Sequence, residues 1–509
     1  MNHQSKTFNS VRNIVFGIGS QAVSLMLSIV NRVIFIHTLG VGVLGINGLF
    51  ADVLTMLSLA DLGLGTAMTY SFYKPLAEND VEKISALLTF YRKIYHIIAA
   101  TISCIGISLI PFLKFIINLD QEIPFLYGYY ILFLANTVVS YLFAYKSSII
   151  YADQRSYMLS IYSTVISLLR LALQSISLIL WKNYIIYLLI QIVATLANNI
   201  CIAYKTNHLY PFVQYDQKLD KSEKKSIFKN IYSIFLYKIS SVLINGTDNI
   251  LISTLIDTVW VGIYSNYSMV ITAVNGFINT LFSSLNASVG KMMVQDTPEK
   301  KYQVFQIMQM MSFCVGGFAF VCFYFLTNDL IALVFGETYV VDRLILTAII
   351  LNFYLGCALQ PLWSYREASG LYVRTKYVML ITAVINIILS IILGMQMGLS
   401  GILFASAISR LLTYFWYEPY LLFKIYFQKK AFLYYLEHLK YAGILLCLIF
   451  ALSLVFELIP GVSWRILILK FVICSLVSIT VYLLINIRSK EYRMLKKRVK
   501  SFFMHFLQK

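Results

Sequence analysis

The run from Ile14 to Leu39, IVFGIGSQAVSLMLSIVNRVIFIHTL, decides the fold class. A helix needs about 20 apolar residues to cross a bilayer. The run exceeds that length, and Arg32 is its only Lys, Arg, Asp or Glu. It is too long for the apolar core of a signal peptide and lacks a small-residue cleavage site. We therefore expect the run to form the first membrane-spanning helix.

The rest of the chain has the same character. Of its 509 residues, 59% are hydrophobic and only 13% are charged. A soluble fold cannot bury so much apolar surface, and the long unbroken apolar runs do not suit a β-barrel. The sequence predicts an all-α polytopic membrane protein with about 14 transmembrane helices. They cover residues 12–38, 44–72, 90–117, 124–150, 157–181, 184–206, 230–255, 260–289, 303–327, 338–364, 374–396, 400–423, 437–458 and 464–487.

The net charge of +18 follows the predicted membrane topology. With the N-terminus in the cytoplasm, lysines and arginines gather in every other connection, Arg366 among them, and few lie in the external connections. Both termini are then cytoplasmic, and the basic excess does not indicate a nucleic-acid partner. The cysteines lack CxxC spacing and the histidines form no HExxH pattern, so we expect no metal site. No nucleophile, base and orienting residue form a set, so we predict no catalytic residue and no enzyme activity.

An internal repeat divides the chain. Asn31-Arg32, followed by Val43 to Ile46, resembles Asp248-Asn249, followed by Trp260 to Ile263, at an offset of 217 residues. The offset places the seventh span on the first. Because six spans is an even number, the two copies are parallel repeats.

The repeat predicts the domain organisation. We expect two six-helix lobes at residues 1–206 and 230–427, joined by a basic cytoplasmic linker at 207–229. Two further helices occupy residues 428–487. The basic tail at 488–509 has apolar residues at helical spacing opposite its lysines and arginines, so we expect it to lie on anionic membrane lipids.

Among the basic side chains of the predicted spans, four are candidates for the membrane interior. Arg32 is in the first span, Arg170 in the fifth, Lys238 in the seventh and Arg410 in the twelfth. Charged groups inside a membrane are costly and usually functional. Because guanidinium and ammonium groups bind phosphate oxygens, a cavity lined by these side chains suits a large diphosphate anion. Two alternatives stay open: Arg32 forms an ion pair with Asp52 at similar depth, and Lys238 extends to the inner interface.

Acids and amides within the spans predict a second role. Asp248 and Asn249 lie in a polar segment of the seventh span, and Asn386 in the eleventh is a candidate partner. Their oxygens suit a coupling site for Na⁺ or H⁺, and equally a hydrogen-bond cluster between helices. Asp52 and Asp61, in the second span, are structural or cavity acids. We expect no cofactor beyond such a coupling ion.

Five segments carry a resemblance to a known family: Asn31 to Gly40, Gly45 to Phe50, Leu57 to Gly65, Tyr73 to Ala77, and Thr247 to Ser253. They resemble the polysaccharide transporter family of the multidrug/oligosaccharidyl-lipid/polysaccharide (MOP) exporter superfamily, whose members flip lipid-linked oligosaccharides in bacteria. The resemblance implies a multi-pass protein of the bacterial plasma membrane. It also implies the cargo, undecaprenyl-diphosphate-linked oligosaccharide repeat units moved from the cytoplasmic to the outer leaflet by alternating access.

The resemblance has further implications. The product feeds a surface polysaccharide such as capsule, exopolysaccharide or O-antigen, with a polysaccharide polymerase and glycosyltransferases as partners. Arg32 is the best-matched cavity cation, whereas the other three cations rest on their depth in the spans. In peptidoglycan-precursor relatives a cation site lies between spans seven and eleven. Asp248 matches that site, but span eleven here offers Asn386 and no acid. The two additional helices imply a groove for the polyprenyl tail.

Two other functions compete with a flippase. An ion-coupled drug exporter of the related multidrug class needs an acidic cavity for cationic substrates, and the four buried cations argue against one. A membrane polysaccharide polymerase or glycosyltransferase needs a large external loop with catalytic residues, and the external connections predicted here are short.

Overall fold

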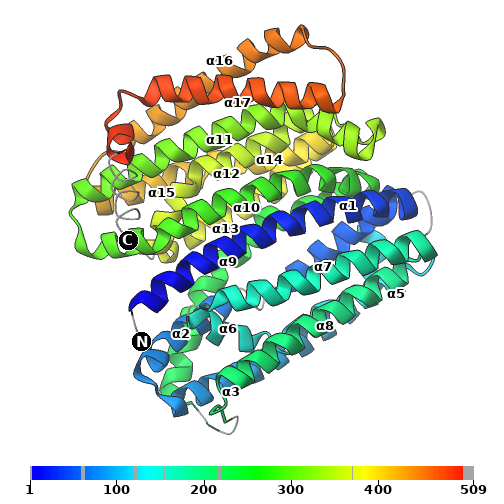
Figure 1. The fold of residues 1–509 in the computed structure, drawn as a ribbon, viewed down its shortest axis with the longest axis vertical. Coiled ribbons are helices and arrows are strands. Elements are labelled where there is room, and N and C mark those ends of the chain that lie inside the picture. Colours follow the sequence, from blue (N-terminus) through cyan, green and yellow to red (C-terminus); the bar gives the residue numbers. More distant parts are fainter. Residues whose placement is uncertain are drawn as a thin grey trace. The chain divides into compact units, whose positions relative to one another are not determined.

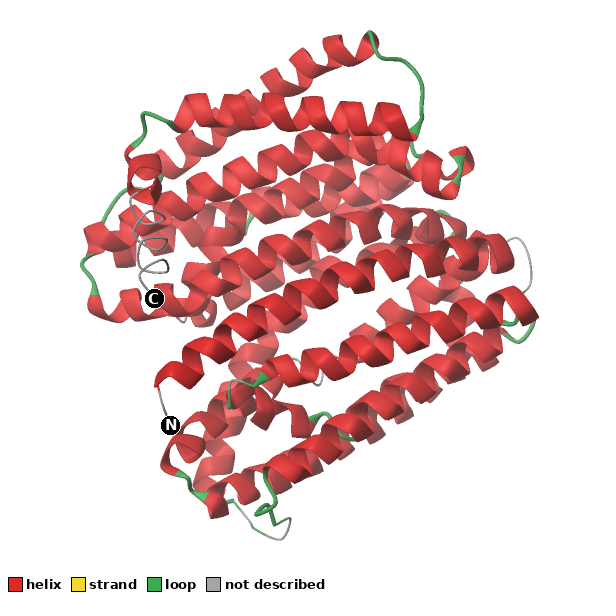
Figure 2. Ribbon diagram, viewed as in Figure 1, coloured by secondary structure: helices red, strands yellow, loops and turns green. Residues whose placement is uncertain are grey.

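The computed structural model describes residues 3–58, 64–118, 123–153, 155–214, 217, 219–369 and 371–496. These residues form helices and connecting turns, with no strand among them (Figure 2). The chain divides into two compact units, Met1–Ser265 and Asn266–Lys509, and each is described by itself.

The first unit is built from long helices joined by short connections (Figure 1). Its elements are α1 (His3–Leu57), α2 (Leu64–Glu78), α3 (Val81–Ser108), η2 (Ile110–Phe112), α4 (Leu113–Ile116), α5 (Leu126–Tyr141), α6 (Tyr145–Ala152), α7 (Ser156–Trp181), α8 (Tyr184–Leu209), α9 (Lys221–Leu255) and the start of α10 (Thr258–Gln295). Helix α1 packs on α7 and α9, α7 packs on α8, and α8 packs on α5.

Helix α1 contains the first predicted span and the first part of the second, and Gly40 separates them; residues 64–72 of the second span lie in α2. The φ of Gly40 is 83° and its ψ is 168°, a non-helical conformation inside α1. This region is accessible almost only to glycine. The predicted tight turn near this position is therefore made by one residue.

The third and fourth predicted spans are bent. Helix α3 meets η2 and α4 at an angle of 41°, where Pro111 is the second residue of the 3₁₀ turn, and α5 meets α6 at 45°. The C-terminal end of the third span is tied to the connection between α9 and α10. The backbone N–H of Thr258 donates to the carbonyl of Asn118 at 2.9 Å, and the N–H of Asn118 donates to the hydroxyl of Thr258 at 3.1 Å.

The two copies of the repeat meet in the first unit at matching glycines. A Cβ atom on Gly45 would lie closer than 3.0 Å to the carbonyl oxygen of Thr258, and one on Gly262 would lie equally too close to that of Val41. The offset of 217 residues relates Gly45 to Gly262 and Val41 to Thr258. The contact is therefore reciprocal, as at a two-fold axis.

The second unit surrounds the long helix α11. Its elements are the rest of α10, α11 (Pro298–Phe335), η3 (Glu337–Tyr339), α12 (Arg343–Ser369), α13 (Tyr372–Met397), α14 (Leu399–Leu412), α15 (Tyr414–Leu422), η4 (Phe423–Phe427), α16 (Phe432–Glu457) and α17 (Trp464–Asn486). Helix α11 packs on α12 and α17, α13 packs on α14, and α16 lies beside α17 (Figure 1).

The fold class is confirmed. Within the described residues nine helices are long and apolar enough to cross a membrane, or up to eleven if each bent pair is one span. The described residues of each predicted span fall mainly on helices, with the second shared by α1 and α2 and the twelfth by α14, α15 and η4. The chain is an all-α, multi-pass membrane protein. Helix α9, predicted to open the second lobe, belongs to the first compact unit, and the domain boundaries stay a prediction.

Candidate functional site

Arg32 and Arg170, two of the predicted cavity cations, gather around one phenol in the first unit. Arg32 is on α1 and Arg170 is on the neighbouring α7, and Tyr187 of α8 lies within electrostatic reach of both. Arg32 donates from Nη2 to the hydroxyl of Ser265, and the Nε atom of Arg170 is buried without a hydrogen-bond partner. Two guanidinium groups and one phenol therefore form a cationic cluster within the membrane-spanning part of this unit.

Tyr187 is oriented by neutral neighbours. Its hydroxyl donates to Oδ1 of Asn31 at 3.2 Å, and Nδ2 of Asn31 donates to the hydroxyl of Ser175 at 3.1 Å. The ring of Phe35 meets the rings of Tyr184 and Tyr187 edge to face, with centroids 5.6 and 5.2 Å apart. Since Asn31 accepts the hydrogen bond of the phenol and aromatic packing fixes its ring, Tyr187 is held in place before any anion binds.

Asp52 and Asn249 form a second polar contact in the same unit. Nδ2 of Asn249, on α9, donates to Oδ2 of Asp52, in the second half of α1. The repeat relates Asn249 to Arg32, and it relates Ser265 to Gly48, one turn before Asp52. The first span of each copy therefore contacts the second span of the other copy from the same position. Arg32 has a cationic side chain there, and its counterpart Asn249 has a neutral one.

The other predicted site residues are distributed over both units. Lys238 and Asp248 are on α9, where the side chain of Lys238 lies outside the described residues, as does the whole of Asp61. Asn386 is on α13 of the second unit, so the predicted coupling site of Asp248, Asn249 and Asn386 draws on both units and stays a prediction.

Asn386 belongs to a polar seam between α13 and α14. It is fully buried and donates from Nδ2 to the hydroxyl of Ser406 at 2.9 Å. One turn before it, the hydroxyl of Thr382 lies 2.6 Å from that of Thr413. Oδ1 of Asn386 and the hydroxyl of Ser390, one turn after it, are buried without hydrogen-bond partners. This row of oxygens holds the two helices together and leaves acceptors unused.

Arg410, the fourth predicted cation, lies in the last turn of α14 beside a buried ion pair. Tyr414 is within electrostatic reach of Arg410, Glu418 and Arg366. Nη1 of Arg366 donates to Oε1 of Glu418 at 2.6 Å, and the two side chains are only 4% and 2% exposed. Oε2 of Glu418 is buried without a hydrogen-bond partner.

Two charged side chains are buried here, and the sequence predicts neither burial. Arg366 follows the predicted span at 338–364, and α12 continues to Ser369 and buries this side chain. Glu418 is a buried carboxylate that hydropathy does not reveal, because the aromatic residues around it keep the span apolar. The signal for it is the acid itself inside a predicted span, since an ionisable residue at membrane depth is usually paired or functional.

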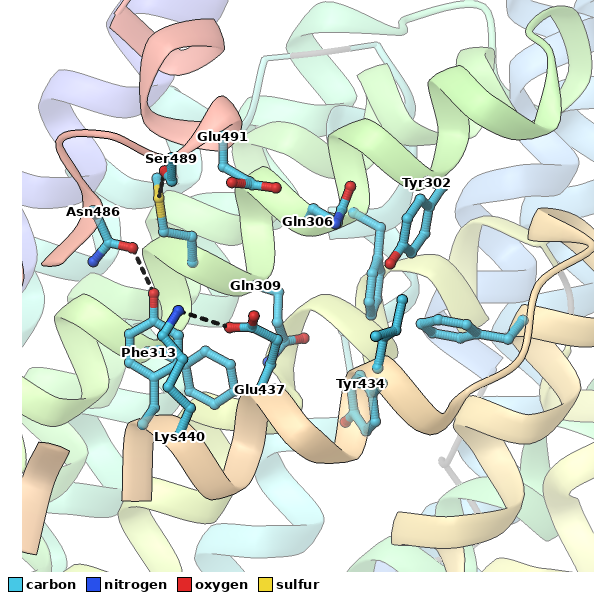
Figure 3. A pocket seen from close by; sticks show the side chains of 15 residues that line it. Tyr302, Gln306, Gln309, Phe313, Tyr434, Glu437, Lys440, Asn486, Ser489 and Glu491 are labelled. Atoms are coloured by element: carbon cyan, nitrogen blue, oxygen red, sulfur yellow. Dashed lines mark hydrogen bonds and ion pairs between the residues drawn. The ribbon is translucent and has the colours of Figure 1, made fainter. Parts of the chain in front are cut away.

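A cavity of about 80 Å³ opens between α11, α16 and the end of α17 (Figure 3). Its walls are aromatic, and its polar groups are partly engaged. The hydroxyl of Tyr441 donates to Oδ1 of Asn486 at 2.6 Å, and Lys440 pairs with Glu437 at 3.4 Å (Figure 3). An adjoining hollow of about 470 Å³ adds Lys429, Lys490 and Arg493. The tail is described only to Lys496, so the predicted lipid-binding helix lies mostly outside the described residues.

A family model described as "Polysaccharide biosynthesis protein" matches residues 10–286, more than half of the chain. The chain belongs to this polysaccharide biosynthesis family. The resemblance read from its sequence motifs is thereby confirmed. No curated protein sequence matches the chain.

Solved structures show the fold of this family member. A structure titled "Lipid II flippase MurJ, inward closed conformation" has a TM-score of 0.68 and 15% identity, over 93% of this chain and 100% of that one. The MATE multidrug transporter DinF-BH has a TM-score of 0.61 and 14% identity, over 84% and 98% of the two chains. The Vibrio cholerae MATE transporter VcmN has a TM-score of 0.54 and 17% identity, over 81% and 95%. The family member therefore has the fold of the MOP exporter superfamily.

Proposed function

We propose that the protein is a flippase for undecaprenyl-diphosphate-linked oligosaccharide repeat units. It moves them from the cytoplasmic to the outer leaflet of the bacterial plasma membrane by alternating access, for assembly of a capsule, exopolysaccharide or O-antigen type of polysaccharide. The protein is a transporter without a catalytic residue of its own. A polysaccharide polymerase and glycosyltransferases act after and before it.

The cationic cluster of Arg32, Arg170 and Tyr187 carries the proposal. A diphosphate loses its hydration when it enters the membrane, and guanidinium groups replace the lost hydrogen bonds with charge-assisted ones. The two arginines come from neighbouring helices, and both act electrostatically on one preoriented phenol. Lys238 and Arg410 add positive charge along the path of the head group in this proposal.

Substitution of the arginines tests this role. We expect Arg32→Gln and Arg170→Gln, each expressed in cells that lack the native gene, to lower surface polysaccharide at least tenfold at unchanged protein level. The lipid-linked precursor should accumulate on the cytoplasmic side. Arg343→Gln is the matched control, because Arg343 is exposed and donates to the carbonyl of Tyr324 at 3.2 Å. Normal polysaccharide in both cluster variants would refute the proposal.

A drug exporter is the second candidate, because MATE transporters share the fold. It predicts drug resistance on expression without any change in lipid-linked sugars. Repulsion between the cationic cluster and a cationic drug argues against it.

The energy source and topology complete the proposal. Asp248, Asn249 and Asn386 are the candidates for a Na⁺ or H⁺ coupling site. Both termini face the cytoplasm, where the basic tail meets anionic lipids, and helices α16 and α17 receive the polyprenyl tail. Transport that is unchanged when either ion gradient is collapsed would remove the coupling site from the proposal.

A further inference from the structure

A pocket of about 200 Å³ lies inside the first unit, between the second half of α1, α5 and α8. Its lining is uncharged and mixed: the aliphatic side chains of Ala51 and Leu54 lie beside the hydroxyl and amide groups of Thr55, Ser58, Asn136, Thr137, Ser140 and Gln191. The rings of Phe133 and Tyr141, both buried, complete the wall. The proposed diphosphate cluster makes no use of this pocket.

The pocket lies where the membrane-spanning helices end. Helix α1 ends at Leu57, next to Ser58, and α5 ends at Tyr141 before its 45° bend into α6. Nδ2 of Asn199 on α8 donates to the carbonyls of Val139 and Ser140, at 2.9 and 3.3 Å, and so satisfies the backbone at the bend. Interrupted helices are tolerated at membrane depth where they line a cavity or a substrate site.

The polar groups of the pocket offer both donors and acceptors. The hydroxyl of Thr195 lies 2.7 Å from Oδ1 of Asn136 and 3.0 Å from the carbonyl oxygen of Gln191, so its one proton is shared between the two acceptors. Asn136 adds its amide group to the wall of the pocket. The hydroxyls of Thr137 and Ser140 donate to carbonyls of their own helix, at 3.0 and 2.6 Å, and so present lone pairs. Gln191 adds an amide from α8. A ligand with many hydroxyl groups can satisfy such a set from all sides.

We propose that this pocket binds one uncharged sugar ring of the oligosaccharide on the transported lipid. The inference rests on the proposed function and adds the sugar subsite to it. Neutral hydroxyls and amides match sugar hydroxyls, and the aromatic wall matches the apolar face of a sugar ring. The volume equals the liquid share of about six or seven waters. That is too large for a bare cation, whose oxygen ligands must close around it at roughly 2.5 Å.

Lipids with and without sugar test the proposal. The purified full-length protein is titrated in detergent with undecaprenyl diphosphate and with the same lipid carrying glucose, galactose or N-acetylglucosamine, and Kd is measured for each. We expect at least one glycosylated lipid to bind about tenfold more tightly than the bare diphosphate, because the pocket adds several hydrogen bonds. Gln191→Leu and Asn136→Leu should each remove most of that advantage and leave the Kd of the bare diphosphate unchanged.

Asn198→Leu is the matched control. Asn198 is also an amide on α8, but it accepts a bond from Ser163 at 3.2 Å and does not line the pocket. It should keep the full advantage of the glycosylated lipid. Because the bare diphosphate reports whether each variant is folded, a damaged protein is recognised directly.

Each result has a defined meaning. An equal Kd for the bare lipid and all three glycosylated lipids would overturn the sugar subsite while leaving the diphosphate site intact. Loss of affinity for both kinds of lipid in the pocket variants would also overturn it. A pocket variant that loses only a Na⁺ dependence of binding would show an ion site instead. Failure of the wild type to bind any of these lipids would overturn the proposed function itself.

Discussion

Arg366 and Glu418 show how one pair of residues governs the interior of the second unit. Their ion pair is almost fully buried, and Oε2 of Glu418 has no hydrogen-bond partner. Taking two charges out of water is costly, so the pair contributes little net stability while it is intact. Removing one partner leaves a buried charge without compensation, which is far more costly than the pair itself.

The pair therefore predicts an asymmetric result. We expect Arg366→Met alone to destabilise the protein by about 3–5 kcal/mol, because Glu418 loses its partner. The double variant Arg366→Met with Glu418→Leu should recover more than half of that loss, since it removes both charges. The apparent Tm of the purified protein in detergent measures both effects. The exposed pair of Lys440 and Glu437 is the matched control, and its Lys440→Met variant should change Tm little.

For single residues, the sequence predicts which charged side chains lie within the membrane and at what depth, but it does not predict which residues they contact. Arg32 and Arg170 are recognisable as intramembrane cations, because a charge in an apolar run is visible at once. Their shared partner Tyr187 is not recognisable, because thirty-seven tyrosines offer the same phenol and only packing selects one. Glu418 is not recognisable for a related reason. Its burial depends on a partner from a distant part of the sequence, Arg366 near the end of α12.

At the scale of elements, the helices can be predicted from the sequence, whereas most of their interruptions cannot. The long apolar runs fix the spans, so their existence is predictable from hydropathy. The bend between α5 and α6 and the break between α14 and α15 are not, because their sequences contain no proline or glycine at the interruption and depend on partners such as Asn199. Gly40 is the exception, since a glycine between two apolar runs predicts a turn.

Gly40 gives the prediction at this scale. Its φ of 83° with ψ of 168° is strained for any residue with a Cβ atom. We expect Gly40→Ala to destabilise the protein by about 1–3 kcal/mol, read as a lower apparent Tm. Gly443, in the middle of α16, is the control, because a methyl group added there would meet nothing within 4 Å. Gly443→Ala should leave Tm unchanged or raise it. Equal effects of the two substitutions would show that the turn at Gly40 is not strained.

For the whole molecule, the repeat is visible both in the sequence and in the contacts. A handful of matching residues at an offset of 217 predicts two parallel copies. The first unit adds what the sequence alone cannot provide, which is that equivalent residues of the two copies touch each other. Gly45 faces Thr258 while Gly262 faces Val41, and Arg32 contacts Ser265 while Asn249 contacts Asp52. A pseudo-two-fold axis therefore passes through this crossing.

This symmetry predicts coupled effects at the crossing. We expect Gly45→Ala and Gly262→Ala each to destabilise the protein by about 1–3 kcal/mol, because each new methyl group meets a backbone carbonyl that cannot move aside. The double variant should lose less than the sum, since the first substitution already separates the helices at the shared contact. Gly48→Ala is the control. Its methyl group would meet only the side chain of Val261 at 3.5 Å, and its counterpart in the other copy is Ser265, which already carries a Cβ atom. Strictly additive losses in apparent Tm would mean that the two glycines lie in independent contacts, and the reciprocal crossing would then be wrong.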